Sequence, residues 1–231
     1  MSAGSVRNPK RYFGDNYTGS VNISRDSHRP VPFESLLEQD CLIRTDAFSP
    51  NLRSIRAQPM EVEYKFDGRW RIWIPDFLRQ MKGLPGRQDP PPALVEVKPL
   101  ISVYPDDPDE AIREQKAAYF KAKFDAIRMQ TLALGYEFVL ATENEIRIEP
   151  SLRNASLMLR CADRCFPKNW ERIGELAVLS LPRSSSIREL EQVLPKDVDA
   201  FSVALRLAWK GDSIVLDPTE KWTRATTFAR V

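Results

Sequence analysis

The sequence predicts an α/β domain with a mixed sheet flanked by helices, followed by a small, mainly helical domain. Three observations support this fold class. Apolar and polar residues alternate on both sides of Asp67-Gly68, an apolar strand pattern precedes a long helical pattern, and the texture becomes mainly helical beyond residue 149. We therefore expect a basic N-terminal arm over 1–30, an α/β domain over 31–149 and a C-terminal domain over 150–231.

The alternation around Asp67-Gly68 predicts a β-hairpin in the α/β domain. A helix is expected before it, over 33–47. Apolar side chains occupy every second position in 59–66, and Asp-Gly is a strong two-residue turn. Along the returning strand we place Trp70, Ile72 and Ile74 on the core face and Trp73 on the opposite face, and we expect the strand to end at 75–77.

The second half of the α/β domain is expected to contain a strand, a long helix and a last strand. The strand covers 93–98, after a Gly/Pro-rich loop at 81–92. The helix covers 109–134 and is closed by Gly135, and the last strand covers 138–141. The side chains expected on the core face of the long helix are Ile112, Phe120, Phe124 and Ile127.

The C-terminal domain shows short helical patterns followed by a pair of extended segments. This order is typical of a winged helix, which would contact DNA or a partner. A small helical domain used only for protein contacts is the alternative. The helical patterns lie at 152–164, 168–179, 187–194 and 198–209, and the extended segments lie near 213–216 and 224–230.

Composition excludes several classes of protein. The 231 residues include 34 Lys+Arg against 32 Asp+Glu, a net charge of only +2. A simple nucleic-acid-coating protein is usually much more basic, so the charge argues against that class. The single histidine, His28, argues against a multi-His zinc site or a His-based catalytic triad. Three cysteines, no secretory leader and no membrane-spanning run predict a cytoplasmic protein with no membrane partner.

The chemistry is expected to come from two carboxylates and a lysine. Glu96 and Lys98 are two apart on one strand, so both side chains leave the same face of the sheet. Asp76 would lie beside Glu96 if the two strands are neighbours. Adjacent carboxylates stay ionised when a cation neutralises them, and a hard divalent metal such as Mg²⁺ does this with oxygen ligands. Lys98 could orient water or stabilise charge on a phosphate.

These motifs resemble TnsA, the endonuclease subunit of heteromeric transposases, including those of CRISPR-associated transposons. Pro75-Asp76 followed by Glu96-Val97-Lys98 is the PD-(D/E)xK pattern of restriction-endonuclease-like nucleases, and the resemblance covers about residues 30–148. The series that carries it is 34–40 (ESLLEQD), 56–59 (RAQP), 75–77 (PDF), 95–99 (VEVKP) and 140–143 (LATE).

The resemblance implies a mechanism and a set of partners. TnsA-like proteins cut the 5′ ends of a transposon, a DDE transposase subunit cuts the 3′ ends, and an AAA+ ATPase regulator links both to target selection. It implies double-stranded transposon-end DNA as substrate and a pair of Mg²⁺ ions, or Mn²⁺ in their place, as cofactor. Lys98 would be the catalytic lysine, and the implied metal ligands are Glu38, Asp76, Glu96 and the carbonyl of Val97. Glu34 is the alternative to Glu38.

Other cationic residues are candidates for DNA contacts. The alternative for the N-terminal arm is a disordered terminus. Five candidates lie in this arm and two on the long helix: Arg7, Lys10, Arg11, Arg25, Arg29, Lys121 and Lys123. The alternatives to a transposase subunit are a stand-alone restriction- or resolvase-like nuclease and a non-catalytic DNA-bridging protein of the same fold. A bacterial cytoplasmic location, at the nucleoid during activity, is expected in the leading interpretation.

Overall fold

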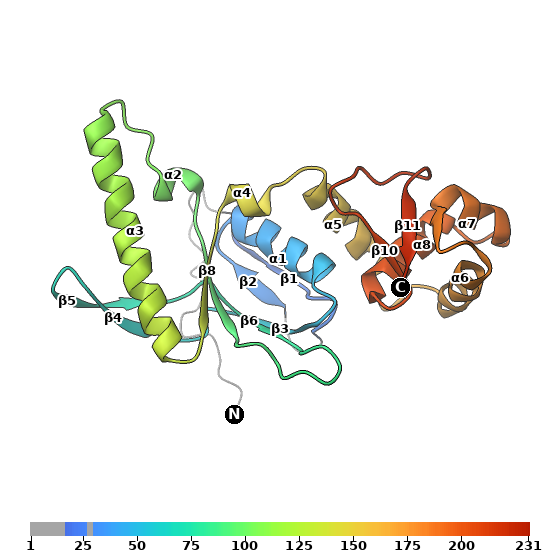
Figure 1. The fold of residues 1–231 in the computed structure, drawn as a ribbon, viewed down its shortest axis with the longest axis horizontal. Coiled ribbons are helices and arrows are strands. Elements are labelled where there is room, and N and C mark those ends of the chain that lie inside the picture. The colour runs from blue at the N-terminus through green and yellow to red at the C-terminus, as the bar shows by residue number, and fades with distance from the viewer. Residues whose placement is uncertain (1–16, 27–29) are drawn as a thin grey trace. The chain divides into compact units, whose positions relative to one another are not determined.

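The computed structural model describes residues 17–26 and 30–231, which form two compact units (Figure 1). Unit 1 contains the described residues up to Leu42 together with Asn51–Ile146, and unit 2 contains Ile43–Pro50 and Arg147–Val231. Helix α1 (Leu36–Phe48) therefore starts in unit 1 and ends in unit 2. In the described part of the chain, no helix is long and apolar enough to cross a membrane.

Unit 1 is built on a four-stranded mixed sheet with the order β3-β6-β7-β8. The pairs β3–β6 and β6–β7 are antiparallel, whereas β7–β8 is parallel. A parallel pair requires a crossover, and helices α2 and α3 supply it. The bounds are β3 Leu52–Ala57, β6 Phe77–Met81, β7 Ala93–Val97, α2 Leu100–Val103, α3 Glu110–Ala133 and β8 Glu137–Ala141, followed by α4 Glu143–Ile146.

Strand β7 is the central element of unit 1, because all five of its residues are buried. Val95 and Val97 belong to one apolar core, which they share with Leu37 and Leu42 of α1. Leu94 belongs to a second core on the other side, formed with α3 and the hairpin. A strand covered on both faces is expected to be an almost continuous apolar run. The exception in this strand is therefore the charged residue Glu96.

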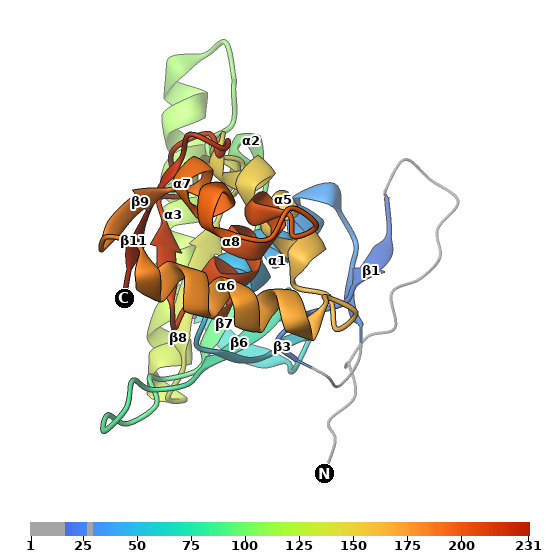
Figure 2. The ribbon, with the colours of Figure 1, turned by 90° about the vertical axis from the view of Figure 1, so that its right-hand side faces the viewer.

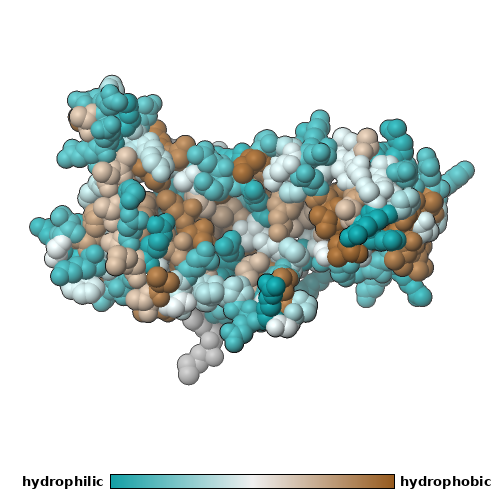
Figure 3. Space-filling model, in the orientation of Figure 1, coloured by the Kyte–Doolittle hydropathy of each residue, from teal (hydrophilic) through white to brown (hydrophobic). Residues whose placement is uncertain are grey.

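The hairpin β4–β5 (Val62–Phe66 and Arg69–Trp73) confirms the predicted turn. Asp67 and Gly68 both have positive φ, 52° and 70°, as a type I′ turn requires. The surface at the hairpin tip is mainly hydrophilic (Figure 3). On the inner side, α3 packs against β4.

The assignment of the two faces of β5 was wrong. Trp70 and Ile72 are 68% and 59% exposed, whereas Trp73 is 6% exposed. The two-residue turn pairs Phe66 with Arg69 and therefore Val62 with Trp73. Directly paired residues share a face, so Trp73 belongs with the buried Val62.

Two strands of the sheet, β3 and β6, were not expected from the pattern. Strand β6 lies between the expected end of the hairpin strand at 75–77 and the expected loop at 81–92, where no element was predicted. Asp76 therefore precedes a sheet strand and does not simply end the hairpin. The long helix is confirmed within one residue at each end, with Asp109 as its N-cap and Gly135 at φ 82° after it. Phe124 and Ile127 are buried as expected, but Ile112 is 41% exposed, because the first turns of α3 extend past the core.

Part of the expected N-terminal arm belongs to the fold. Strand β1 (Gly19–Val21) pairs antiparallel with β2 (Val31–Phe33), and Ile23 is buried in the core that contains α1. Four of the proposed DNA-contacting residues and the single histidine lie outside the described residues: Arg7, Lys10, Arg11, Arg29 and His28.

Unit 2 is mainly helical (Figure 2). Its small antiparallel sheet has the order β10-β11-β9. The predicted helices and extended segments are all present, and β9 is an addition. The bounds are α5 Ser151–Cys161, α6 Lys168–Ser180, β9 Ser184–Ser186, α7 Ile187–Val193, α8 Ala200–Lys210, β10 Ile214–Leu216 and β11 Thr227–Arg230.

Helix α8 is the core helix of unit 2. It packs against α5, α6, α7 and β10, and none of its residues is exposed. Val203, Ala204 and Leu207 are completely buried. Gly174 of α6 allows the close approach, since a Cβ there would lie 2.2 Å from a methyl group of Val203.

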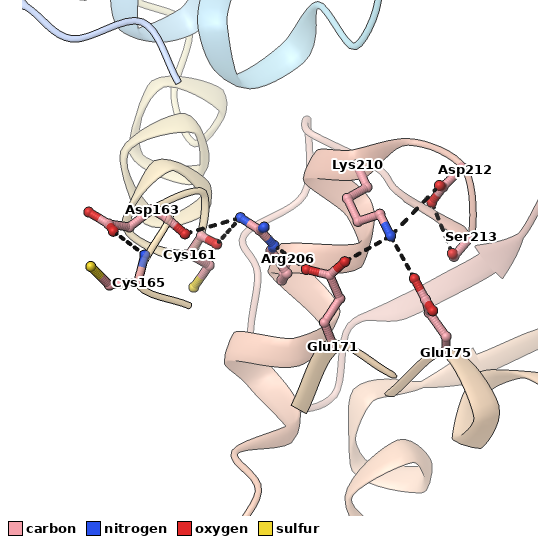
Figure 4. Close-up of polar contacts among 9 residues, drawn as sticks. All are labelled: Cys161, Asp163, Cys165, Glu171, Glu175, Arg206, Lys210, Asp212 and Ser213. Carbon is pink, nitrogen blue, oxygen red and sulfur yellow. Dashed lines mark hydrogen bonds and ion pairs between the residues drawn. The ribbon is translucent and has the colours of Figure 1, made fainter. Parts of the chain in front are cut away.

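The two cations of α8 are bound inside unit 2 (Figure 4). Arg206 Nε donates to Glu171 Oε2 at 2.8 Å, and its guanidinium also donates to two backbone carbonyls. Lys210 Nζ lies 2.9 Å from Glu171 Oε1 and 2.6 Å from Glu175. Burial would raise the pKa of Glu171, but the hydrogen bonds from Lys210 and Arg206 outweigh it and lower that pKa. Glu171 therefore joins α6 to both cations of α8, and Glu175 adds a second contact to Lys210.

Replacing Glu171 by Gln is expected to lower the free energy of unfolding of unit 2 by roughly 1–3 kcal/mol at pH 7, because two charge-assisted hydrogen bonds are weakened. Since the pKa of Glu171 is lowered on folding, this contribution is complete above its ordinary value of 4.5 and is lost as the pH falls through the folded value. Urea denaturation followed by tryptophan fluorescence at pH 7 and pH 3 measures both effects.

The matched control is Glu191→Gln, which removes an exposed ion pair with Arg224. Exposed pairs contribute about 0–1 kcal/mol, so this variant is expected to unfold close to the wild type. Equal losses in the two variants would contradict the role assigned to Glu171.

Candidate active site

The pairing of β6 with β7 brings the predicted acidic residues together. Phe77 is paired with Val95, so Asp76, which directly precedes β6, lies beside the end of β7. The backbone N–H of Val97 donates to Asp76 Oδ2 at 2.7 Å, which fixes this carboxylate at the strand end. Asp76 and Glu96 are thus neighbours through β6, a strand that the sequence pattern did not reveal.

Lys98 lies between the two carboxylates. Its Nζ is 2.9 Å from Glu96 Oε1 and 3.7 Å from Asp76 Oδ2. Its backbone N–H donates to the carbonyl of Ala141 at 3.0 Å, so the end of β8 holds the residue in place. The three charged side chains of the predicted motif therefore form one contact group.

Burial controls the electrostatics of this group. It raises the pKa of Asp76 to about 7, repulsion from Glu96 adds to the rise, and Lys98 partly offsets it. For Lys98, burial alone would lower the pKa, but the attraction of Glu96 and Asp76 outweighs it, and the pKa is raised. The lysine is consequently cationic at neutral pH, which suits the stabilisation of negative charge.

Glu38 lies near this group but is bound at the start of α1. Its Oε1 accepts from the hydroxyl of Ser35 at 3.0 Å, and its Oε2 accepts from the backbone N–H of Glu34 at 2.8 Å. The negative charge of Glu38 contributes to the raised pKa of both Asp76 and Lys98. Burial raises the pKa of Glu38, and the hydrogen bonds partly offset that rise. Whether it is a metal ligand stays a prediction, as does the alternative, Glu34.

Two further residues, Trp73 and Gln58, contact the site, and neither was assigned to it from the sequence. The indole N–H of Trp73 donates to Glu96 Oε2 at 2.7 Å. Gln58 has φ 43°, and its backbone N–H donates to the carbonyl of Asp76 at 2.9 Å. Its buried side-chain oxygen has no hydrogen-bond partner in the described part of the chain. The two-residue turn was a signal for Trp73, because it places Trp73 on the buried face with Val62.

Three of the proposed DNA-contacting residues belong to the described part of the chain, and all three are distant in sequence from Asp76 and Glu96. Lys121 is 81% exposed and pairs with Asp125 at 3.1 Å, on the solvent side of α3. The Lys123 ammonium lies 5.8 Å from the centre of the Phe124 ring. Arg25 follows β1 and is half-buried. Their contacts with DNA stay predictions.

The donor set fits a hard divalent cation. Mg²⁺ is commonly held by one or two carboxylates, with water or substrate oxygens completing its shell. Asp76 and Glu96 supply two such carboxylates at one strand end. No group of three or more His, Cys, Asp or Glu side chains suited to a metal forms within 17–26 and 30–231, so the fit rests on this pair.

A comparison with protein families gives the identity of this region. The family model described as TnsA-like endonuclease N terminal matches residues 49–143. Residues 49–143 are a TnsA-like endonuclease N-terminal domain. The TnsA-like domain contains Asp76, Glu96 and Lys98, whereas Glu38 lies before its first matched residue. A search among curated proteins gave no match.

The acidic pair is expected to destabilise the TnsA-like domain at alkaline pH. Because the pKa of Asp76 is raised on folding, from 3.8 to about 7, the folded chain binds more protons and stability falls as the pH rises through this interval. In EDTA at pH 8, the free energy of unfolding of Asp76→Asn should therefore exceed that of the wild type by roughly 1–3 kcal/mol, and the difference should be smaller at pH 4. Urea denaturation at the two pH values measures both free energies.

The control for this experiment is Asp125→Asn, which changes an exposed carboxylate of α3. It should show no gain at pH 8. A wild type more stable than Asp76→Asn at pH 8 would mean that Lys98 and the Val97 amide more than compensate the buried charge.

Proposed function

We propose that the protein is a Mg²⁺-dependent DNA endonuclease subunit that cleaves the 5′ ends of a transposon, together with a DDE transposase and an AAA+ ATPase regulator. The observation that carries the proposal is the convergence of Asp76, Glu96 and Lys98 inside the TnsA-like domain. One buried acid, one partly buried acid and one cation at a strand end are a group that phosphodiester hydrolysis can use without a histidine.

Each residue of the site has a defined part in this proposal. Asp76 and Glu96 would hold the metal, with the carbonyl of Val97 and the carboxylate of Glu38 as further ligands. When bound, the metal would activate water and stabilise charge on the phosphate oxygens. Lys98 would stabilise the negative charge that develops on the same oxygens, as its cationic state favours.

The sheet supports a restriction-endonuclease-like fold for unit 1. Strands β6 and β7 carry the acidic motif at their adjacent ends, and the crossover through α3 places β8 parallel to β7. We include the PD-(D/E)xK assignment in the proposal on this ground.

For unit 2 we propose a winged-helix-like domain. Its order of elements, α6-β9-α7-α8-β10-β11, and its sheet order, β10-β11-β9, support this assignment. Helix α8 would be the recognition helix of a DNA-reading winged helix, but it is covered, and its cations are bound by Glu171 and Glu175. Contact with a partner protein is therefore the role that this unit supports better.

The proposal is tested with transposon-end DNA, Mg²⁺ and the partner transposase. The wild type should nick the 5′ ends, Asp76→Ala should reduce nicking to background, and Lys98→Met should slow it by roughly 10²–10³-fold, the usual loss when an electrostatic stabiliser is removed. Asp125→Ala, at an exposed carboxylate of α3, should cut at the wild-type rate.

Partner dependence separates the alternatives. A transposase subunit is expected to be almost inert without the DDE partner, whereas rapid cutting by this chain alone would indicate a stand-alone nuclease. If Asp76→Ala cuts as well as the wild type, the assignment of the site is wrong. Binding and bridging of DNA with no cleavage under any condition would indicate a non-catalytic protein.

A further inference from the structure

Glu96 is held at both carboxylate oxygens by donors from different elements. Lys98, just after β7, contacts Oε1 at 2.9 Å, and Trp73, at the end of β5, donates to Oε2 at 2.7 Å. Glu96 and Trp73 are only 5% and 6% exposed, so water does not compete effectively for this hydrogen bond. The orientation of the carboxylate therefore depends on a residue of the hairpin.

The aromatic core fixes the indole of Trp73. Its ring packs edge-on against Phe138 of β8, with ring centroids 5.5 Å apart and an interplanar angle of 65°. Phe138 stacks on Phe124 of α3 at 5.9 Å, and Phe124 stacks on Phe120. A row of aromatic rings from β8 and α3 thus limits rotation of the indole and directs its N–H towards Glu96.

An indole N–H differs from Lys98 as a partner for the carboxylate. It donates one hydrogen bond, carries no net charge and does not titrate in the physiological range. It can therefore fix the direction of Oε2 without neutralising the negative charge that a cation would need. Partners of this kind behind metal ligands commonly change metal affinity by about 10–100-fold when they are removed.

We propose that Trp73 is a positioning residue of the active site, which orients the Glu96 carboxylate for metal binding. The inference rests on the proposed function, because it takes Glu96 as a ligand. It also explains why a tryptophan ends the hairpin strand at a buried position: the ring completes the aromatic core, and the N–H satisfies a buried carboxylate oxygen.

The test measures binding of Mn²⁺ to the DNA-free full-length protein by isothermal titration calorimetry. Trp73→Phe keeps an aromatic ring against Phe138 and removes the donor, so Mn²⁺ affinity is expected to fall about 10–100-fold. Trp70→Phe is the matched control on the same strand, because Trp70 is 68% exposed, and it should bind Mn²⁺ like the wild type.

A second variant separates positioning from a general loss of stability. Phe138→Leu removes the edge-on contact but keeps the indole N–H, and it is expected to lower the urea midpoint at least as much as Trp73→Phe while weakening Mn²⁺ binding less. If affinity instead follows the urea midpoint across both variants, Trp73 has only a structural role. Binding by Trp73→Phe within twofold of the wild type would also overturn the inference.

The same measurements distinguish failure of the inference from failure of the proposed function. A wild type that binds Mn²⁺ while Trp73→Phe binds equally well overturns the role of Trp73 alone. A wild type that neither binds Mn²⁺ nor nicks transposon-end DNA with its partner overturns the metal-dependent function, and the positioning role with it.

Discussion

The burial of the Glu96 carboxylate, beside the partly buried Asp76, is the constraint on which the rest of unit 1 depends. A carboxylate removed from water is costly unless hydrogen bonds and a cation compensate it. The compensation comes from three places in the chain: the amide of Val97, the ammonium of Lys98 and the indole of Trp73. The sheet provides the first two, and the hairpin provides the third. The hairpin is thus part of the site although it belongs to a separate two-stranded sheet.

The pairing of charges within the chain bears on how a nearly neutral protein could act on DNA, as the proposed function requires. Many of its described cations have an internal anionic partner: Arg206 and Lys210 face Glu171, and Lys121 faces Asp125. Such residues add little to long-range attraction for a polyanion. A subunit that shares DNA binding with partner proteins needs less positive charge of its own, so the low net charge agrees better with a subunit than with an enzyme that binds DNA alone.

Local sequence patterns predicted several helices and strands, whereas pairing between distant segments brings the residues of the candidate site together. The turn follows from its Asp-Gly dipeptide, strand β7 from a short apolar run and helix α3 from its helical periodicity, and all three were found in the sequence. Strands β3 and β6 have mixed burial patterns that do not alternate cleanly, so periodicity did not reveal them. Asp76 was expected beside Glu96 through the hairpin strand that ends near it, but the neighbour of β7 is β6, which Asp76 precedes.

The error over Trp70 and Trp73 has a simple physical origin. Alternation alone cannot say which of two faces of a strand is buried when both carry aromatic or aliphatic residues, as in Arg69–Trp73. The turn length settles the question, because a two-residue loop pairs Phe66 with Arg69 and fixes every later pair. Applying that register to the sequence would have placed Trp73 on the same face as Val62, on the core side of the hairpin.

Glu38 shows how one short pattern can serve two physical roles. Ser35 and Glu38 have the spacing of a capping box, and they bond reciprocally at the start of α1: the N–H of Glu38 donates to Ser35 Oγ at 3.1 Å, and Ser35 Oγ donates to Glu38 Oε1. A carboxylate oxygen has more than one lone pair, so a capping glutamate can also face a cation. The cap then holds Glu38 near Asp76 and Lys98 through α1 itself. A metal ligand at this position would be oriented by the helix start, just as Glu96 is oriented by Trp73.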